Sequence, residues 1–126
     1  MKVFITLALL FIANSIFALE PNYSDVTSAI QKNDIAQLQN HLADNVDITL
    51  PSNEGVYSKS QAMHVLKNFF SKHQAKSCSI MHTGNSGDSY YLLADLTAGG
   101  ESYGVFIYHK ASNGSHVIQK ITIEED

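Results

Sequence analysis

Apolar positions recur every three or four residues in the first half of the chain beyond residue 18, and every second residue in the second half. The first period is typical of amphipathic helices and the second of strands that bury one face. The spacing of Val26, Ala29 and Ile30 predicts a first helix, with Ser24 placed to cap it. We expect this helix to stop near Asn33.

A second short helix and a strand are expected next. Asp34 is followed three residues later by Gln37, the spacing of a capping box, and the stripe of apolar residues over 35–42 continues the helical period. Asn45 suits a left-handed stop to this helix. Apolar and polar residues then alternate over Val46–Leu50, which predicts a strand that the following proline ends.

The third helix has the most specific start signal in the chain. Ser58 and Gln61 form the pattern S-x-x-Q, in which each side chain satisfies a backbone donor that the first helical turn leaves free. One continuous apolar face follows, made of Ala62, Val65, Leu66, Phe69 and Phe70. His64 falls on the opposite, polar face, and His73 lies at the helix end, where the helix dipole favours a cation. We therefore expect His64 to be solvated rather than catalytic.

From Lys76 onward the period changes from helical to alternating, which predicts four strands. Their residues are 76–83, 90–97, 102–110 and 116–123. Gly99-Gly100 and Asn113-Gly114 separate the last three, and both pairs are typical of two-residue hairpin turns, whose central residues need positive φ. The chain contains no long linker and no internal repeat.

The two hairpin turns fix a predicted register. Under it the pairs are Leu93 with Phe106, Tyr91 with Tyr108, His109 with Ile118, Tyr108 with Gln119, and Phe106 with Ile121. One face then holds Tyr91, Leu93, Asp95, Gly104, Phe106, Tyr108, Val117, Gln119, Ile121 and Ile123. The opposite face holds Leu92, Ala94, Leu96, Tyr103, Val105, Ile107 and Ile118, with His109, His116 and Lys120 at its margins.

Both predicted faces are apolar in their middles, yet three short helices can cover only one of them. An uncovered apolar face in an antiparallel sheet indicates a second subunit or another bound partner. We therefore expect a homodimer through the sheet. The alternative is that the register is off by one residue, which would exchange the side chains between the faces.

The first eighteen residues, MKVFITLALLFIANSIFA, have the order of a secretory signal peptide: a positive Lys2, an apolar run, and small residues before a cut after Ala18. We expect residues 1–18 to be a signal peptide and residues 19–126 to be one domain, exported to the periplasm or secreted. No later segment is long and apolar enough to span a membrane. The mature protein is therefore expected to have no membrane span.

Charge and cysteine content narrow the classes of partner. The chain has a formal net charge of −4 and contains no arginine, so nucleic acid and anionic membrane surfaces are not expected partners. Cys78 is the single cysteine, which excludes an intrachain disulfide and predicts a small buried hydrophobic side chain. Nothing in the sequence calls for a cofactor.

Candidate chemistry is sparse. Asp95 shares its predicted face with Tyr91 and Tyr108, but it lies near the turn at Gly99-Gly100, where water reaches it, so we expect no catalytic residue. The six histidines include His109 and His116, diagonal neighbours across the last hairpin that could share a cation. No third ligand stands at a defining spacing, so no metal site is predicted. His82 alternates with Cys78 and is expected on an interior face.

A polar band across one apolar face is the most specific candidate site. Tyr91, Tyr108 and Gln119 form this band, and a buried amide without partners costs about 1–3 kcal/mol. Gln119 is therefore expected to bond the tyrosines, water or a ligand. One interpretation is a satisfied internal network, and the other is a small apolar ligand pocket completed by Phe69 and Phe70 of the third helix.

The order of elements and several motifs carry a resemblance. YSKSQA at residues 57–62, the Phe69-Phe70 helix end, HTGNSG at residues 82–87 and the final VIQKITI resemble a small family of exported bacterial proteins of unknown function. The order of elements is similar to the cone of nuclear transport factor 2 and ketosteroid isomerase. The resemblance implies an α+β, cystatin-like fold, with N-terminal helices packed on a curved antiparallel sheet. It also implies an envelope location and a dimer, and it supplies no activity.

Two functions from different classes remain. The first is a non-catalytic module of the cell envelope that binds a small apolar ligand or another protein. The alternative is a small lyase or isomerase, like ketosteroid isomerase, that uses the interior of the same cone. An enzyme of this kind needs a buried carboxylate with a shifted pKa inside the cone, so the position of Asp95 discriminates between the two.

Overall fold

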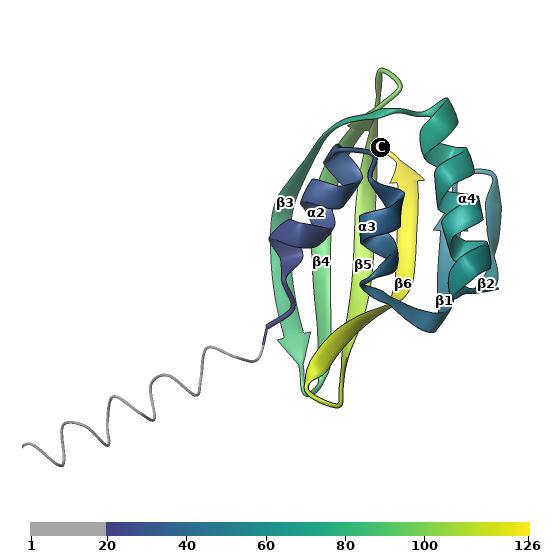
Figure 1. Cartoon of the computed structure of the whole chain (residues 1–126). Helices are drawn as coiled ribbons and strands as arrows, with labels where there is room; N and C mark the ends of the chain where they lie inside the picture. The colour runs from purple at the N-terminus through teal and green to yellow at the C-terminus, as the bar shows by residue number, and fades with distance from the viewer. Residues whose placement is uncertain (1–19) are drawn as a thin grey trace, which may run out of the picture.

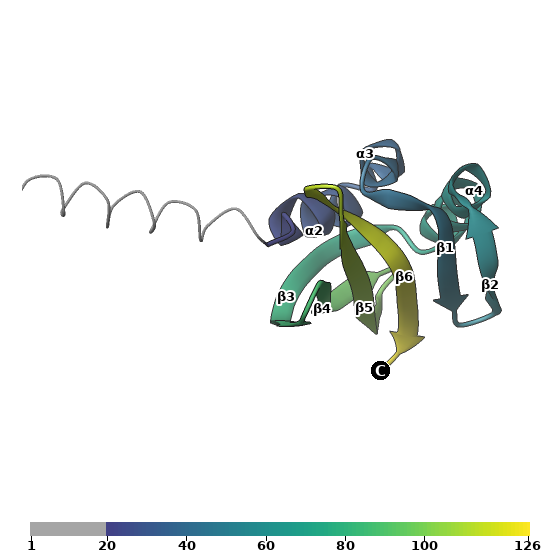
Figure 2. The same cartoon turned by 90° about the horizontal axis from the view of Figure 1, so that it is seen from below.

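Helices lie on one face of a curved sheet in the computed structural model, which describes residues 20–126 (Figures 1 and 2). The helices are α2 (Tyr23–Gln31), α3 (Ile35–Gln39) and α4 (Lys59–Lys72). The strands are β1 (Leu42–Leu50), β2 (Asn53–Ser58), β3 (Ala75–Ser86), β4 (Ser89–Ala98), β5 (Glu101–Ser112) and β6 (Ser115–Glu125). The expected signal peptide, residues 1–18, lies outside the described residues. Between residues 20 and 126, no helix combines the length and the apolar character that a membrane crossing requires.

The six strands form one sheet in the order β2-β1-β6-β5-β4-β3. Every neighbouring pair is antiparallel except β1 and β6, which run parallel. Figure 2 shows that the sheet curves around the helices, with α2 near β3 and α4 beside β1 and β2. The α+β cone expected from the sequence is confirmed, with this one parallel pair as a departure from an antiparallel sheet.

The helix starts depend on side-chain caps, as the sequence predicts for two of them. The Ser58 hydroxyl accepts from the Gln61 amide nitrogen and the Gln61 side chain accepts from the Ser58 nitrogen, so α4 begins at Lys59 with the expected capping box. Asp34 caps α3 as expected, accepting from the Gln37 nitrogen at 3.1 Å. The prediction for α2 is wrong by two residues, because Asn22 rather than Ser24 caps it.

Two other local predictions differ from the structure. Asn45 does not end a helix: α3 already ends at Gln39, and Asn45 lies in β1 opposite Ser58. The left-handed asparagine in this region is Asn33, with φ 57°, in the short connection between α2 and α3. Strand β2 was not expected, because its residues carry no alternating pattern. It forms because the turn after Leu50 returns the chain alongside β1.

The β4–β5 register is confirmed, with Leu93 opposite Phe106 and Tyr91 opposite Tyr108. Both hairpin turns also have the expected positive φ. The β5–β6 register is confirmed at His109, opposite Ile118, but is wrong beyond it. A bulge leaves Gln119 without a partner, so Tyr108 faces Lys120. The same shift places Phe106 opposite Thr122 and Ile107 opposite Ile121.

This bulge decides which side chains enter the core. Gln119 is exposed, while Ile121 and Ile123 are each 1% exposed and lie on the helix-covered face. The uncovered face is therefore less apolar along β6 than predicted, although Leu93 and Phe106 still occupy its middle. Lys120, Thr122 and Glu124 occupy the positions on the uncovered face that the sequence register gave to Gln119, Ile121 and Ile123.

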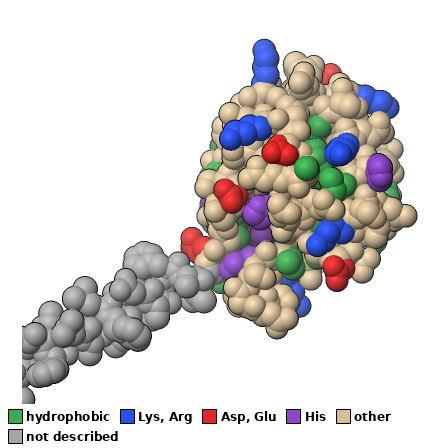
Figure 3. Space-filling model, in the orientation of Figure 1, with side chains coloured by type: hydrophobic (Ala, Val, Ile, Leu, Met, Phe, Trp, Pro, Cys, Tyr) green, Lys and Arg blue, Asp and Glu red, His purple; other side chains and the backbone are tan. Residues whose placement is uncertain are grey.

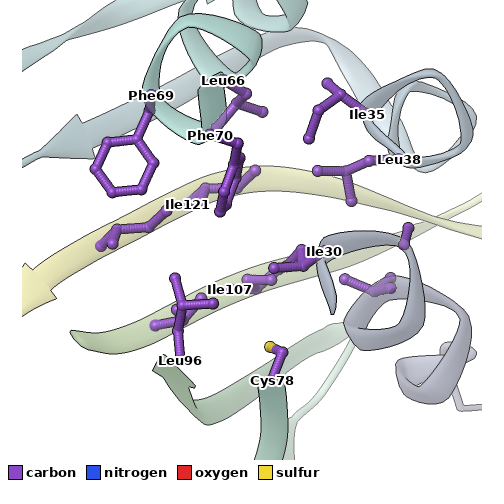
Figure 4. Close-up of a cluster of buried hydrophobic side chains, with 14 of the residues drawn as sticks. Ile30, Ile35, Leu38, Leu66, Phe69, Phe70, Cys78, Leu96, Ile107 and Ile121 are labelled. Atoms are coloured by element: carbon purple, nitrogen blue, oxygen red, sulfur yellow. The ribbon is translucent and has the colours of Figure 1, made fainter. Parts of the chain in front are cut away.

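The core lies between the helices and the inner face of the sheet. Figure 4 shows side chains from all three helices meeting those of the strands: Ile30, Ile35, Leu38, Leu66, Phe69, Phe70, Cys78, Leu96, Ile107 and Ile121. Cys78 is buried as expected, and burial raises the pKa of its thiol to about 11. Phe69 and Phe70 contact each other edge to face, with ring centroids 5.1 Å apart.

The bulge makes a sharp prediction for a pair of substitutions in β6. Ile121→Ala should lower the free energy of unfolding by about 2–5 kcal/mol, because it leaves a cavity in the core. Gln119→Leu should change it by less than about 0.5 kcal/mol, because the side chain is exposed. Urea denaturation of both variants measures this. Equal effects at the two positions would contradict the bulge.

Candidate functional site

The uncovered face of the sheet carries a group of apolar and aromatic side chains. We call it the outer strip, and its members are Met81, His82, Tyr91, Leu93, Phe106 and Tyr108. The strand pairing places them side by side across β3, β4 and β5. Met81 and Leu93 are 63% and 40% exposed, so the strip presents large apolar side chains to solvent. No described helix covers this face (Figure 2).

Ring packing orders the middle of the outer strip. Tyr91 stacks on Phe106 with ring centroids 6.2 Å apart, and the His82 ring lies 5.9 Å from Tyr91 on the other side. Gly84 is required here, because a Cβ at this position would lie 2.3 Å from the Tyr91 ring. The Tyr108 hydroxyl is 2.6 Å from the Ser89 hydroxyl, which fixes the second tyrosine. The strip is therefore preorganised rather than a set of free side chains.

A shallow hollow of about 300 Å³ lies at one end of the outer strip. Met81, Leu93 and Phe106 form its apolar part, and Asp95 and Glu124 also line it. Both carboxylates are exposed. The site therefore combines an apolar centre with an acidic margin, which suits burial of an apolar partner surface more than chemistry on a substrate.

The structure separates the five residues predicted to form the ligand pocket. Tyr91 and Tyr108 are neighbours on the outer strip, as expected. Phe69 and Phe70 lie in the core beneath α4, on the opposite side of the sheet. Gln119 sits at the bulge and is exposed. The five residues therefore do not converge: the bulge removes Gln119 from the row of the tyrosines, and the helix carrying Phe69 and Phe70 packs on the other face.

The interior of the cone is filled by the core. Among residues 20–126, every aspartate and glutamate is exposed except Asp47, which is half-buried. Asp95, the candidate base, is exposed on the uncovered face at a strand end, as the sequence indicated. An isomerase mechanism of the ketosteroid type therefore has no buried carboxylate among the described residues to act as its base.

A polar chain lies at the end of α4. The buried Tyr103 hydroxyl donates to Glu101 at 3.2 Å and is 3.3 Å from His73 Nδ1. Burial, followed by the charge and hydrogen bond of Glu101, raises the pKa of Tyr103. His73 caps α4 and packs on Phe69 with centroids 4.7 Å apart, so this chain ties the helix end to β5. His64 is exposed, as expected, in the wall of a hollow of about 610 Å³ between α4 and the β1–β2 turn.

His109 is the strongest polar anomaly in the core. It is 1% exposed, and neither ring nitrogen has a hydrogen-bond partner. The Tyr23 ring meets it edge to face at 5.6 Å, and Tyr90 meets His116 in the same way at 4.9 Å. Burial, with smaller contributions from His116 and His41, lowers the pKa of His109 to about 4. Figure 3 shows histidine side chains gathered on the helix-covered side, low in the view.

No third ligand among the described residues supports the hypothesis that His109 and His116 share a cation. Within the described part of the chain, no three His, Cys, Asp or Glu side chains come together as a metal site. The two histidines are separated in register, because His109 faces Ile118 and His116 faces Ala111. The nearby His116 instead contributes to the lowered pKa of His109.

Two features of the site escaped the sequence analysis. His82 was expected on an interior face, but a bulge at Met81 in β3 turns it outward beside Tyr91. The burial of His109 was also missed, since the sequence placed it at a margin of its face. The alternating pattern of its strand places His109 on the same face as the apolar residues before it, which is a signal for its burial. No residue pattern marks the bulge at Met81.

Acid should destabilise the protein through His109. The folded pKa is about 4 against an ordinary 6.5, so the unfolded chain binds more protons between these values. The free energy of unfolding should fall as the pH falls through this window, by up to about 1.4 kcal/mol per pH unit. His109→Phe should remove this part of the slope, because it leaves an apolar ring in the same place.

Urea denaturation at four pH values between 7.5 and 4 checks this prediction. His64→Gln is the matched control, because it removes an exposed histidine and should keep the wild-type slope. The difference between wild type and His109→Phe isolates the histidine from the titrating carboxylates. Parallel curves for these two proteins would contradict the assignment.

Comparison with known proteins places this geometry in a family. A family described as "Domain of unknown function (DUF4783)" matches residues 23–124. A DUF4783 family crystal structure from Bacteroides uniformis is 22% identical and superposes with a TM-score of 0.77, covering 82% of this chain and 95% of that one. A second one, from Bacteroides ovatus, is 18% identical with a TM-score of 0.79, covering 86% and 96%.

A broader relationship is visible in the fold alone. An NTF2-like protein from Cytophaga hutchinsonii is 14% identical with a TM-score of 0.64, covering 82% of this chain and 92% of that one. Among curated proteins, none matches the chain. The family match spans nearly all of the described residues, from the first turn of α2 to the end of β6. The chain therefore belongs to the DUF4783 family, a family of unknown function with the nuclear transport factor 2-like fold.

Proposed function

We propose that the protein is a non-catalytic protein-interaction module of the cell envelope, and that its outer strip binds a second copy of the chain. The observation that carries this proposal is an exposed, preorganised apolar surface on the sheet face that no described helix covers. Burying apolar area of this kind is the main favourable term in association.

The shape of the outer strip favours a protein surface over a small ligand. Its hollow of about 300 Å³ is at the lower limit of ligand pockets, which usually enclose most of the ligand. Stacked rings at the centre and carboxylates near one end resemble the apolar core and polar rim of an interface. Leu93 and Phe106 face each other across the central strands, so a two-fold axis near this pair would bury the strip against itself.

The enzymatic alternative has less support. An isomerase of the same fold needs an acid inside the cone, and the described carboxylates are exposed or, at Asp47, half-buried. Fold similarity alone does not assign an activity. We therefore place the function on the surface of the sheet.

The envelope location rests on the sequence of the first eighteen residues. Their positive start, apolar run and small residues before the cut have the order of a signal peptide. We propose cleavage after Ala18, which would release residues 19–126 into the periplasm or the medium. The family match begins at residue 23, just after the proposed cut.

The dimer makes a quantitative prediction for residues 19–126. Sedimentation at micromolar concentration should give twice the monomer mass for the wild type. Phe106→Asp should give the monomer mass, because a dimer would bury its carboxylate against an apolar surface. His64→Asp is the matched control on the helix-covered side and should stay dimeric. A monomeric wild type would remove the dimer proposal.

Export makes a separate prediction for the full-length chain. Expressed in a Bacteroides host, it should be recovered from the periplasmic or extracellular fraction with Leu19 as its N-terminal residue, as read by mass spectrometry of the intact protein. Adding charge to the apolar run, as in Leu9→Lys with Leu10→Lys, should retain it in the cytoplasm. Uncleaved chain in the wild-type cytoplasm would contradict export.

A further inference from the structure

The two halves of β3 differ in how their free edge is covered. β3 ends the sheet, so it pairs with β4 on one side and has no strand on the other (Figure 1). An unpaired strand edge presents a row of backbone donors and acceptors that can bind another chain. The first half of β3 lies against α2, whereas the second half extends beyond it.

Side-chain amides occupy the first half of the edge. Asn33 accepts from the Ala75 nitrogen at 2.9 Å and donates to the Ala75 oxygen at 3.1 Å. This reciprocal pair of bonds is the pattern that a residue of a neighbouring antiparallel strand would make. Gln31 continues the pattern by accepting from the Cys78 nitrogen at 3.4 Å. The protein thus covers the start of β3 with groups that imitate a peptide backbone.

No such cover reaches the second half. Cys78 directs its nitrogen outward, and alternation along an antiparallel strand directs Ile80 the same way. Counting from the two-residue turn, Ser86 pairs with Ser89, so Asn85 and Thr83 also direct their backbone groups outward. Within residues 20–126, no side chain bonds these three outward positions.

The open half also lacks two of the usual protections against strand pairing. Native edges are commonly blunted by charged side chains or proline, yet Ser77–Gly87 contains neither. Ile80 and Met81 are 43% and 63% exposed. The bulge at Met81 bends the strand, and the stretch from His82 to Ser86 beyond it pairs regularly with β4. The open edge is therefore exposed and uncharged, with its apolar side chains at Ile80 and Met81, and it is suited to a partner strand that is uncharged and places apolar side chains against these two.

We propose that the edge of β3 from Ile80 to Asn85 binds an extended, neutral, apolar segment of another protein, which adds a seventh strand to the sheet. The chemistry of the occupant follows from what covers the first half. Asn33 and Gln31 bond the backbone of Ala75 and Cys78, and a peptide backbone would supply the same donors and acceptors from Ile80 onward. The absence of charge from Ser77 to Gly87 selects a segment without charged side chains, because a buried charge there would have no counter-charge.

This edge shares Met81 and His82 with the outer strip but uses different groups of the chain. Strand addition uses backbone groups in the plane of the sheet, whereas the outer strip uses side chains perpendicular to it. A dimer formed through the outer strip would leave the outward groups of Thr83 and Asn85 free. The proposal therefore stands whether or not the chain dimerises.

Panning a phage-displayed library of random 12-residue peptides on residues 19–126 tests the proposal. The enriched peptides are expected to lack charge and to alternate apolar residues. Their dissociation constants should be unchanged by Thr83→Ser and at least about tenfold weaker with Thr83→Pro, because proline removes an outward N–H without breaking a bond to β4. Phe106→Asp should leave peptide binding unchanged.

Amide hydrogen exchange of the wild-type protein gives a measurement that needs no variant. Bound peptide should slow exchange at Thr83 and Asn85 and leave Ala75 and Cys78 as they were. A library without enriched peptides, or peptides that protect other segments, would overturn the proposal. If the wild type is a dimer and the Thr83→Pro variant is a monomer, a second copy of the chain occupies the edge. The assignment of a different partner protein would then be wrong.

Discussion

The two-sided pairing of β6 is the constraint on which the rest of the structure depends. This strand lies at the centre of the sheet, antiparallel to β5 and parallel to β1. The bulge at Gln119 coincides with an irregularity in the β1 pairing, where Leu42 matches Ile118 and Asp47 matches Lys120. The bulge places two successive side chains, Gln119 and Lys120, away from the core and returns Ile121 to it. Without it, the inner face would lose the residues that α3 and α4 pack against.

Local chemistry made much of the fold predictable, and long-range pairing explains what was not. Ser58 and Asp34 carry their capping signals within four residues, and the turn at Gly99-Gly100 fixes the β4–β5 register from its own need for positive φ. The bulges at Met81 and Gln119 are marked by no residue pattern, and the one at Gln119 coincides with irregular pairing to β1, which is distant in sequence. A one-residue slip exchanges the faces of β6, which is why Gln119 does not join Tyr91 and Tyr108. Phe69 and Phe70 are separated from the tyrosines because the helices pack on the other face of the sheet.

Because core side chains fill the interior of the cone, the outer face and the edge of the sheet are the surfaces on which we place the function. Ile107, Leu96 and Ile121 are buried between the helices and the sheet. The polar groups that do enter the interior serve structure or resist charging: Tyr103 joins the end of α4 to β5, and His109 is held neutral by burial. A core organised in this way offers rigidity, and it offers little chemistry.

The packed core also supports the two surfaces proposed to bind partners. The outer strip keeps its stacked rings because Gly84 leaves room for Tyr91, so an approaching surface meets a fixed shape. The edge of β3 pairs with β4, with a bulge at Met81, and is closed at its start by Asn33 and Gln31. If the open edge had no function, there would be no reason for side-chain amides to bond the backbone of one half while the other half carries neither charge nor proline. The contrast within one strand is therefore better explained by a partner for the open half than by incomplete protection.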